Sequence, residues 1–450
     1  MSRTDVVIVG AGAAGLSLAH WLTVPGAPGS AFGTGTGTGA GAGAGTGTGA
    51  GPRTDAGTGT WAGGGPLDVT LVEAPGGPLR PAPRTWCYWE PPGGPYDQLL
   101  TASWDRLRVR APDGSGEVLR TDPLRYKMLR STDFEAAVGA RLAQVPWVRR
   151  VTATVDTVVD SPGGAEVVGT RPDGSPLRLR ARWVLDSRPP RVLPPARTVL
   201  LQHFRGWFVT TDDPVFRSGT ADLMDFRTPQ PDRGLSFGYV LPTGPRTALV
   251  EYTEFSPGVI GDAAYDRALR HYLGTVLGVG RYTVTGTEHG VIPMTDARLP
   301  RRTGASVFPI GAAGGATRPA TGYTFAGTQR QTRAVAAALR SGRTPLPPPA
   351  HGARSRAMDA VLLRALDTGR VGGADFFARL FRTVPTPVLL RFLDGGTGPA
   401  RDVSIGLRTP VLPMLRTALE LPLLRRRPHP GAPAAPASPP SPTPHREGSP

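Results

Sequence analysis

Cysteine, lysine and long apolar runs are nearly absent from this sequence. Cys87 is the only cysteine, so no disulfide can form within the chain, and nothing indicates an exported, disulfide-stabilised protein. No run of about 20 uninterrupted apolar residues occurs, so we predict no membrane-spanning helix. The glycine-spaced, β-branched N-terminal segment also differs from a signal peptide. We predict no metal site.

The net charge of +16 comes almost entirely from arginine, because Lys127 is the only lysine. A nucleic-acid-binding surface would combine clustered cations with interleaved aromatic residues. The arginines are scattered instead, and their local concentrations are 301–302 and 425–427. We therefore predict no nucleic-acid partner and relate more of the charge to an anionic membrane surface.

Residues 5–19 form a β-branched run that breaks at three glycines and continues as a segment compatible with a helix. This pattern predicts a strand, a phosphate-binding turn and a helix, as in a Rossmann-type fold. Gly10 would form the tight turn, Gly12 would let the backbone approach a pyrophosphate, and Gly15 would allow close packing of helix on strand. The helix N-terminus would supply free N–H groups to the phosphates.

A second strand, at 67–73, ends in Glu73, where dinucleotide folds place a carboxylate that binds a ribose hydroxyl. The alternative is an ordinary carboxylate at the end of a strand. The strand comes late because residues 25–65 are mainly Gly-Thr and Gly-Ala repeats, with too few large apolar side chains to fold. We interpret them as a flexible low-complexity insertion, where added length costs little.

Another strand, at 307–310, runs into a second glycine-rich turn. Gly311, Gly314 and Gly315 would place backbone amides against the flavin-side phosphate and ribityl chain of FAD. Ala312 occupies a position where redox flavoenzymes usually carry aspartate, so it is not counted as a cofactor ligand. Two such turns in one chain are far more specific than either alone.

Strand-like stretches bounded by proline and glycine fill residues 199–255 and predict an antiparallel sheet. One face would be aromatic and apolar, a suitable floor for a long, flat hydrocarbon. Before this sheet, residues 84–89 hold an aromatic cluster that either belongs to a core or binds substrate.

Apolar residues at helical spacing predict a helical region at 355–425. It is either a cap packed on the body or a basic, apolar platform lying on a membrane. Residues 426–450, rich in proline, serine and alanine, are predicted to be disordered.

The predicted fold is therefore α/β: a Rossmann-type FAD-binding domain, a second antiparallel-sheet substrate domain, and the C-terminal helices. The FAD-binding domain would be discontinuous, built from 1–24 and 66–198 with a return segment at 290–343, and the substrate domain would span 199–289.

Taken together, the sequence resembles the lycopene cyclase family of FAD-binding carotenoid enzymes, in its bacterial β-cyclase form. The resemblance covers about residues 5 to 425, apart from the repeat tract. Its motifs lie at residues 10–15, 84–89, 186–190, 223–227, 249–253, 290–294, 311–315 and 318–323.

The resemblance implies a catalytic acid. The family's Phe-Leu-Glu-Glu-Thr signature corresponds to residues 249–253, where its first glutamate falls on Glu251 and its second on Tyr252. Adjacent side chains of a strand face opposite sides, so only one of the two positions can point at the substrate. Glu254 lies on the side of Tyr252 and is a weaker candidate.

The implied reaction is an isomerisation that turns ψ end groups of lycopene into β rings, giving γ-carotene and then β-carotene. C2 is protonated, the cation at C1 is captured by the C5=C6 double bond, and C6 loses a proton. The resemblance implies FAD in its reduced form, with NAD(P)H as the reductant and no net redox change. Glu251 would hold its proton because an apolar pocket disfavours the charged form.

Aromatic faces could stabilise the cation, and the candidates are Trp86, Tyr88, Trp89 and Phe237. Weaker candidates for the substrate site are Asp225, Arg227 and Arg318, each of which could instead be a buried partner that orders loops.

We expect a cytoplasmic protein that binds peripherally to the cytoplasmic face of a membrane and acts on one or both ends of lycopene or another acyclic-ended carotene. One alternative is an FAD-dependent monooxygenase or prenyl reductase acting on a long apolar substrate, since fold does not fix function. A carotenoid carrier that keeps the fold without catalysis is another.

Overall fold

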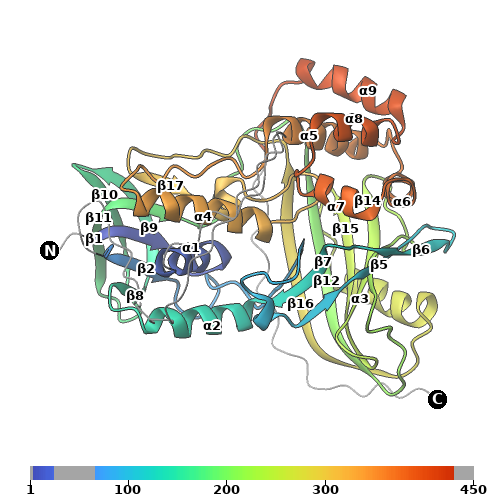
Figure 1. The fold of residues 1–450 in the computed structure, drawn as a ribbon, viewed down its shortest axis with the longest axis horizontal. Coiled ribbons are helices and arrows are strands. Elements are labelled where there is room, and N and C mark those ends of the chain that lie inside the picture. The colour runs from blue at the N-terminus through green and yellow to red at the C-terminus, as the bar shows by residue number, and fades with distance from the viewer. Residues whose placement is uncertain (1–3, 25–65, 430–450) are drawn as a thin grey trace, which may run out of the picture.

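A computed structural model describes residues 4–24 and 66–429 of the chain. The predicted insertion at 25–65 and all but the start of the predicted tail lie outside these residues. The described chain is α/β, with two large sheets side by side, a small sheet between them, and C-terminal helices over the second sheet (Figure 1). This arrangement confirms the predicted fold class.

The first large sheet has the strand order β8-β2-β1-β11-β10-β9, with β17 pairing with β11. The strand β1 is buried on both faces: Val6 and Ile8 pack into one core, and Val7 and Val9 pack into another. β1, β2, β8, β11 and β17 run parallel, and β10 pairs antiparallel with β11 on one side and with β9 on the other. The strands are β1 (Thr4–Val9), β2 (Val69–Glu73), β8 (Val148–Thr152), β9 (Thr154–Ser161), β10 (Gly164–Thr170), β11 (Pro176–Asp186) and β17 (Val307–Pro309).

Three helices cover one face of this sheet: α1 (Ala13–Thr23), α2 (Ser131–Ala143) and α4 (Phe325–Arg340). The small sheet has the order β3-β7-β4 and consists of β3 (Thr85–Glu90), β7 (Arg125–Arg130) and β4 (Ala102–Trp104). It joins the two large sheets, since β3 contributes residues to the core of each.

The second large sheet has the order β16-β12-β15-β14-β13-β5-β6. Its strands are β16 (Tyr282–Thr295), β12 (Val199–Thr211), β15 (Thr247–Ser256), β14 (Leu235–Pro242), β13 (Ala221–Asp225), β5 (Arg106–Arg110) and β6 (Gly116–Arg120). Its pairs are antiparallel except for β13 with β5, so the sheet is mixed. On its far face lie α3 (Asp262–His271) and the π-helical turn η2 (Tyr272–Val276).

The observed sheet corrects the predicted domain boundaries. β16 continues past residue 289 to Thr295, because the whole length of β12 pairs with it. The β5–β6 hairpin comes from the segment assigned to the FAD-binding domain, yet it extends the second sheet beyond β13. A strand's own sequence gives its period but not the sheet that it joins, so both boundaries were misplaced.

The C-terminal helices are α5 (Ala353–Asp367), α6 (Gly373–Thr383), α7 (Thr386–Leu393), α8 (Pro399–Gly406) and α9 (Val411–Glu420), followed by η4 (Leu421–Leu423). α5, α6 and α7 bury apolar side chains in one core with the second sheet. Residues 426–429 are ordered, because Arg427 forms a β-bridge with Ala196, which corrects the predicted start of the tail. Among the described helices, none is both long and apolar enough to cross a membrane.

Candidate active site

The first glycine turn connects β1 to α1. Gly10 has φ of +94°, and its amide donates to the carbonyl of Val72 at 2.8 Å. A Cβ on Gly15 would lie 1.8 Å from the carbonyl oxygen of Gly10, so only glycine lets the helix approach so closely. A Cβ on Gly12 would meet no atom within 4 Å. The backbone at the start of α1 therefore faces open space that a ligand can approach.

The second glycine turn, η3 (Gly311–Gly314), follows β17 and meets the first turn. A Cβ on Gly311, which has φ of +66°, would lie only 2.5 Å from the Cβ of Ala14 at the start of α1. The Gln331 side chain fixes the turn, accepting from the Gly311 amide at 2.8 Å and donating to the carbonyl of Gly314 at 3.0 Å. Gly315 ends the turn with φ of +78°. The structure thus brings together two turns about 300 residues apart, as a dinucleotide with two phosphates requires.

Glu73 ends β2 at the same edge of the sheet. Its carboxylate accepts a hydrogen bond from Arg150 Nη2 on β8 at 2.7 Å, a partner that the sequence did not indicate. The edge as a whole fits a dinucleotide such as FAD, because a free helix N-terminus, two glycine turns in contact and a carboxylate lie along it.

Glu251 lies on β15, on the face of the second sheet that points toward the small sheet and α6. Its side chain is 9% exposed, and Thr253 Oγ1 donates to its Oε1 at 2.6 Å. Burial, the largest effect, and the nearby Glu288 carboxylate together raise the pKa of Glu251 to about 8, although the hydrogen bond from Thr253 acts in the opposite direction. Near neutral pH this carboxyl group is therefore in its acid form.

Glu288 is a second buried carboxyl group that sequence reasoning missed. Gly206 on β12 pairs with Glu251 on one side and with Glu288 on β16 on the other. The glycine leaves the space between the two acids free of a side chain, because its Cβ would lie 3.6 Å from Glu251 Oε2. Thr85 Oγ1 donates to Glu288 Oε2 at 2.7 Å, and burial raises the pKa of Glu288. Only the register of β16 against β12 reveals this pair.

Glu254, the weaker candidate, lies on the opposite face of the sheet. Its Oε2 accepts from the hydroxyl of Tyr252 at 3.2 Å, and His203 Nε2 lies 3.8 Å from its Oε1. These residues pack beneath α3, away from Glu251. The alternation of side chains along β15 therefore leaves Glu251 as the acid on the inner face.

An apolar pocket lies between β13–β15, the small sheet and helices α6 and α7. The hollow measures about 360 Å³ only when the open solvent at its mouth is counted, and the enclosed space is much smaller. Tyr239 on its wall pairs directly with Glu251 across β14 and β15, so the acid lies at the edge of the pocket. The lining residues are Trp89, Leu223, Met224, Phe237, Tyr239, Phe255, Thr321, Tyr323, Phe377, Phe381 and Leu393.

The predicted aromatic residues divide between two sites. Trp89 and Phe237 line the pocket, with the rings of Trp89 and Tyr323 4.5 Å apart. Trp86 and Tyr88 point to the other side of β3, where their rings lie 5.2 and 4.8 Å from that of Phe325. Since β3 alternates its side chains, these two residues pack in the core beside α4 and do not line the pocket, so their role in substrate binding stays a prediction.

The predicted polar candidates do not reach the pocket either. Asp225 is fully buried, and it accepts from Arg227 Nε at 2.9 Å and from the hydroxyl of Tyr272 at 2.9 Å. Arg318 is 2% exposed and pairs with Asp359 on α5 at 2.9 Å. Each arginine satisfies a buried carboxylate, so we assign all three predicted residues to structural ion pairs.

Within residues 4–24 and 66–429, no group of three or more histidine, cysteine, aspartate or glutamate side chains could hold a metal ion. Glu251 and Glu288 are not among the residues that line the pocket. Glu251 lies beside its wall residue Tyr239, so the chemistry available there is that of one buried acid next to aromatic and apolar walls.

Comparison with known proteins agrees with this geometry. The family model described as "Lycopene cyclase protein" matches residues 58–419. No curated protein matches the chain.

Several solved structures share the fold at low sequence identity. A geranylgeranyl bacteriochlorophyll reductase-like protein from Thermoplasma acidophilum is 13% identical, with a TM-score of 0.62 over 92% of this chain and 98% of that one. A flavoprotein/dehydrogenase from Cytophaga hutchinsonii is 12% identical, with a TM-score of 0.58 over 94% and 100%. The p-nitrophenol 4-monooxygenase of Pseudomonas putida DLL-E4 is 17% identical, with a TM-score of 0.53 over 95% and 100%.

Proposed function

Because the chain belongs to the lycopene cyclase family, we propose that it is a lycopene β-cyclase, which converts ψ end groups of lycopene or another acyclic-ended carotene into β rings. The observation that carries the proposal is Glu251, a carboxyl group kept protonated at the edge of an aromatic, apolar pocket. A hydrocarbon end group offers no polar handle, so the reaction needs a carboxyl group that still holds its proton at the working pH and walls that exclude water.

The residues that would act on the substrate lie on the inner face of the sheet. Thr253 donates to Oε1 of Glu251, which leaves Oε2 to carry the proton. That proton is transferred to C2 of the end group, the C5=C6 double bond captures the cation, and loss of the C6 proton restores neutrality. One proton enters and one leaves, so there is no net redox change. The Trp89 and Phe237 rings would face the developing positive charge.

We also propose FAD as the cofactor. Gly10, Gly12 and Gly15 would hold one phosphate, Gly311, Gly314 and Gly315 the other, and Glu73 the ribose. When bound in its reduced form, with NAD(P)H as reductant, the flavin supplies negative charge that stabilises a cationic intermediate. Several solved proteins with this fold are described as flavoproteins or flavin-dependent enzymes, which supports the choice.

Substitution of Glu251 tests the proposed role of the acid. We expect Glu251→Gln to lose at least about a hundredfold in cyclisation rate, the usual scale for a general acid. The matched control is Glu254→Gln, three residues along the same strand on the opposite face, which should keep most of the activity. Flavin content is measured in both proteins. An active, flavin-loaded Glu251→Gln protein would contradict the assignment.

The proposed location is the cytoplasmic face of a membrane, to which the protein binds peripherally. The proposed substrate is an apolar polyene that dissolves in the bilayer, so the pocket must receive it from lipid.

A further inference from the structure

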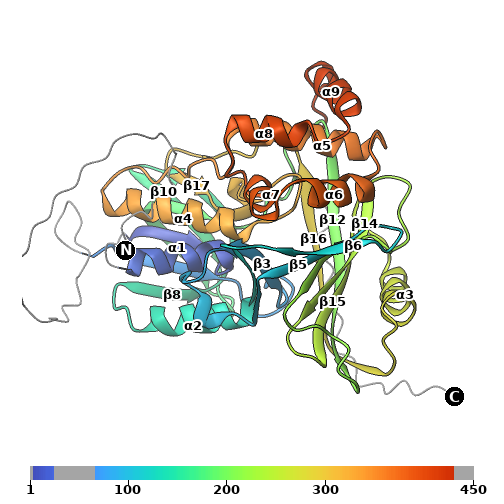
Figure 2. The ribbon, with the colours of Figure 1, turned by 45° about the vertical axis from the view of Figure 1, so that its right-hand side comes forward.

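The outermost C-terminal elements, α8, α9 and η4, expose an unusual number of large apolar side chains. Figures 1 and 2 show α9 beyond α5, on the side away from the sheets. Seven of the thirteen large apolar side chains exposed in the described part of the chain lie between residues 403 and 423. They are Val403, Leu407, Val411, Leu412, Leu415, Leu419 and Leu423, here called the apolar surface. A patch of this kind on a folded protein indicates an interaction site.

Helix α9 exposes its apolar face, whereas an ordinary surface helix buries it. Leu412, Leu415 and Leu419, spaced to share one face of the helix, are 78%, 52% and 68% exposed. The only residue of α9 that is buried is Thr417, a polar one. The apolar face of the helix therefore points to solvent, and its polar face points to the protein.

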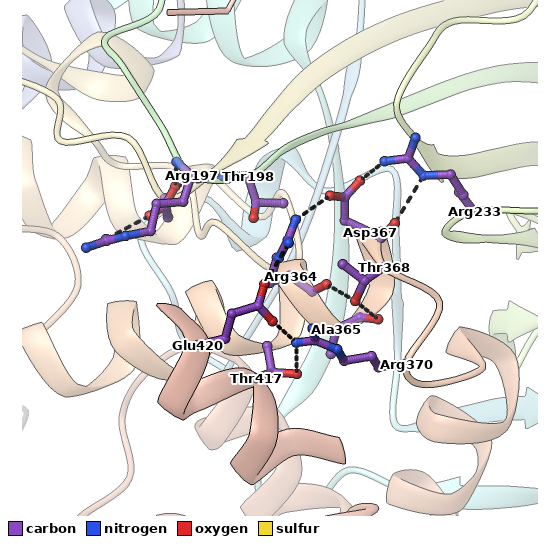
Figure 3. Close-up of polar contacts among 11 residues, drawn as sticks. Arg197, Thr198, Arg233, Arg364, Ala365, Asp367, Thr368, Arg370, Thr417 and Glu420 are labelled. Atoms are coloured by element: carbon purple, nitrogen blue, oxygen red, sulfur yellow. Dashed lines mark hydrogen bonds and ion pairs between the residues drawn. The ribbon is translucent and has the colours of Figure 1, made fainter. Parts of the chain in front are cut away.

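Polar contacts hold α9 in this orientation (Figure 3). Glu420 accepts from Arg364 Nη2 on α5 at 2.7 Å and forms a second ion pair with Arg370. Arg370 Nη1 also donates to Thr417 Oγ1 at 3.2 Å. These ion pairs, together with Met414 packed against the core and the buried Leu421, fix the inner side of the helix, so its leucines at 412, 415 and 419 remain available for another partner.

Between residues 399 and 429, the segment that carries the apolar surface, the exposed charged side chains are all positive. Arg401, Arg416, Arg425 and Arg427 are exposed. The two carboxylates between residues 399 and 429 are engaged: Asp402 is buried against Arg354, and Glu420 is paired on α5. An apolar surface on a segment whose exposed charges are all positive complements anionic lipid headgroups above an acyl interior. Against a second copy related by a twofold axis it would place arginine against arginine.

We propose that α8, α9 and η4 dock on an anionic lipid bilayer, with the leucines of α9 in the acyl region and the flanking arginines at the headgroups. Arginine can extend its guanidinium toward the headgroups while its stem stays in apolar surroundings. The docking is independent of the reaction. If the proposed function also holds, the pocket under α6 and α7 lies on the membrane side of the enzyme, where an apolar polyene can enter.

Flotation with lipid vesicles tests the docking. The full chain, loaded with flavin, is mixed with vesicles of phosphatidylcholine alone or of equal parts phosphatidylcholine and phosphatidylglycerol. We expect binding to the anionic vesicles, weakened at least about tenfold in the double variant L412S/L419S. The matched control L79S/V192S, which removes two comparably exposed apolar side chains elsewhere, should bind like the wild type.

A separate set of variants tests how much the arginine charges contribute to vesicle binding. R401Q/R416Q should lower the affinity for anionic vesicles about fivefold for each arginine removed, and added salt should have a similar effect. R217Q, in the loop after β12, is the control and should leave binding unchanged. Melting temperatures of all variants show whether they are folded.

Three outcomes would overturn the proposal. These are no vesicle binding by the wild type, equal binding by L412S/L419S and its control, or a dimer in solution that L412S/L419S dissociates. The E251Q protein should bind vesicles like the wild type, so failure of the proposed reaction and failure of the docking are distinguishable.

Discussion

The carboxyl group of Glu251 keeps its proton mainly because it is buried. Two neighbours modify this effect: the Glu288 carboxylate raises the pKa, and the hydrogen bond from Thr253 lowers it. Arg84 and Arg130 favour the charged form of Glu288, since both lower its pKa against the effect of burial. Two neighbouring groups, Glu288 and Thr253, therefore act on the proton of Glu251, and the pH dependence of the reaction reports on each of them.

We expect cyclisation to fall as the pH rises through about 8, because the acid form of Glu251 is then lost. Glu288→Gln removes a nearby negative charge, so the pKa of Glu251 falls and the alkaline limb moves to lower pH, by up to about one unit. Thr253→Val removes a bond that favours the charged form, so the limb moves to higher pH. The measurement is the initial rate against pH for the three flavin-loaded proteins.

Shifts in opposite directions distinguish a direct effect on Glu251 from a loss of folding, which would lower the rate at every pH. If the limb stays in place in Glu288→Gln, the two carboxyl groups do not interact, and Glu288 has a purely structural role beside Thr85.

Glu251 could be predicted as the acid from the sequence alone, by the family signature and by the alternation of side chains along a strand. Glu288 could not be identified from the sequence, because its position beside Glu251 depends on the pairing of β16 with β12 across Gly206. The sequence also did not show that Asp225 and Arg227 pair with each other outside the pocket lining, because a conspicuous charged pair does not reveal which face of a sheet it occupies. Trp86 and Trp89 lie on one short strand, and only the structure shows which side of β3 meets the pocket.

Gly12, in the turn between β1 and α1, and Gly15, in the first turn of α1, are required for different reasons. Gly15 permits the helix to pack on the strand, whereas Gly12 has open space where a side chain would be. The first is a requirement of the fold, and the second is a requirement only if a ligand approaches the helix N-terminus.

We expect Gly12→Ala to fold with an unchanged melting temperature in the flavin-free state but to bind FAD at least about tenfold more weakly, because the methyl group occupies the space for a phosphate. Gly15→Ala should instead lower the melting temperature by several degrees, since its Cβ would overlap the Gly10 carbonyl. Thermal melts and flavin titrations separate the two. Equal flavin affinity in Gly12→Ala and the wild type would contradict a phosphate site at this turn.

Most individual helices and strands could be predicted from the local spacing of apolar residues, but the way in which they assemble could not. The β-branched run before Gly10 and the amphipathic series of α6 are visible in the sequence, because the period of apolar residues identifies strand and helix. The parallel pairing of β5 with β13 is not, since the partners are more than 100 residues apart. The orientation of α9 was also hidden, because an apolar stripe does not tell whether it faces a core or a membrane.

Across the whole molecule, a buried ion pair links the loop before α4 to the C-terminal helices. Arg318 and Asp359 are 2% and 3% exposed, and burial raises the pKa of Asp359 to about 6 although the arginine opposes this effect. The Arg318 amide also donates to the carbonyl of Tyr323, a residue of the pocket wall, at 2.9 Å. This pair thus connects α5 to the loop that carries the pocket aromatics.

Arg318→Leu should destabilise the protein by ~3–5 kcal/mol at neutral pH, because it leaves Asp359 buried without a partner. The loss should be smaller at about pH 5, where Asp359 can be protonated, since its pKa is already raised to about 6. In the double variant Arg318→Leu, Asp359→Leu, part of the stability should return. Denaturant unfolding at the two pH values measures this, and an equal loss at both would show that the arginine acts through packing instead.

The measurement that tests the central claim most directly is pigment analysis in a lycopene-accumulating bacterium that expresses the chain. We expect new carotenes with the mass of lycopene and one or two β rings, with the number of rings showing whether one or both ends react. The Glu251→Gln protein should leave lycopene unchanged. A product that gains hydrogen or oxygen would contradict the isomerase and indicate a redox flavoenzyme, and unchanged lycopene with soluble, flavin-loaded wild-type protein would contradict lycopene cyclisation.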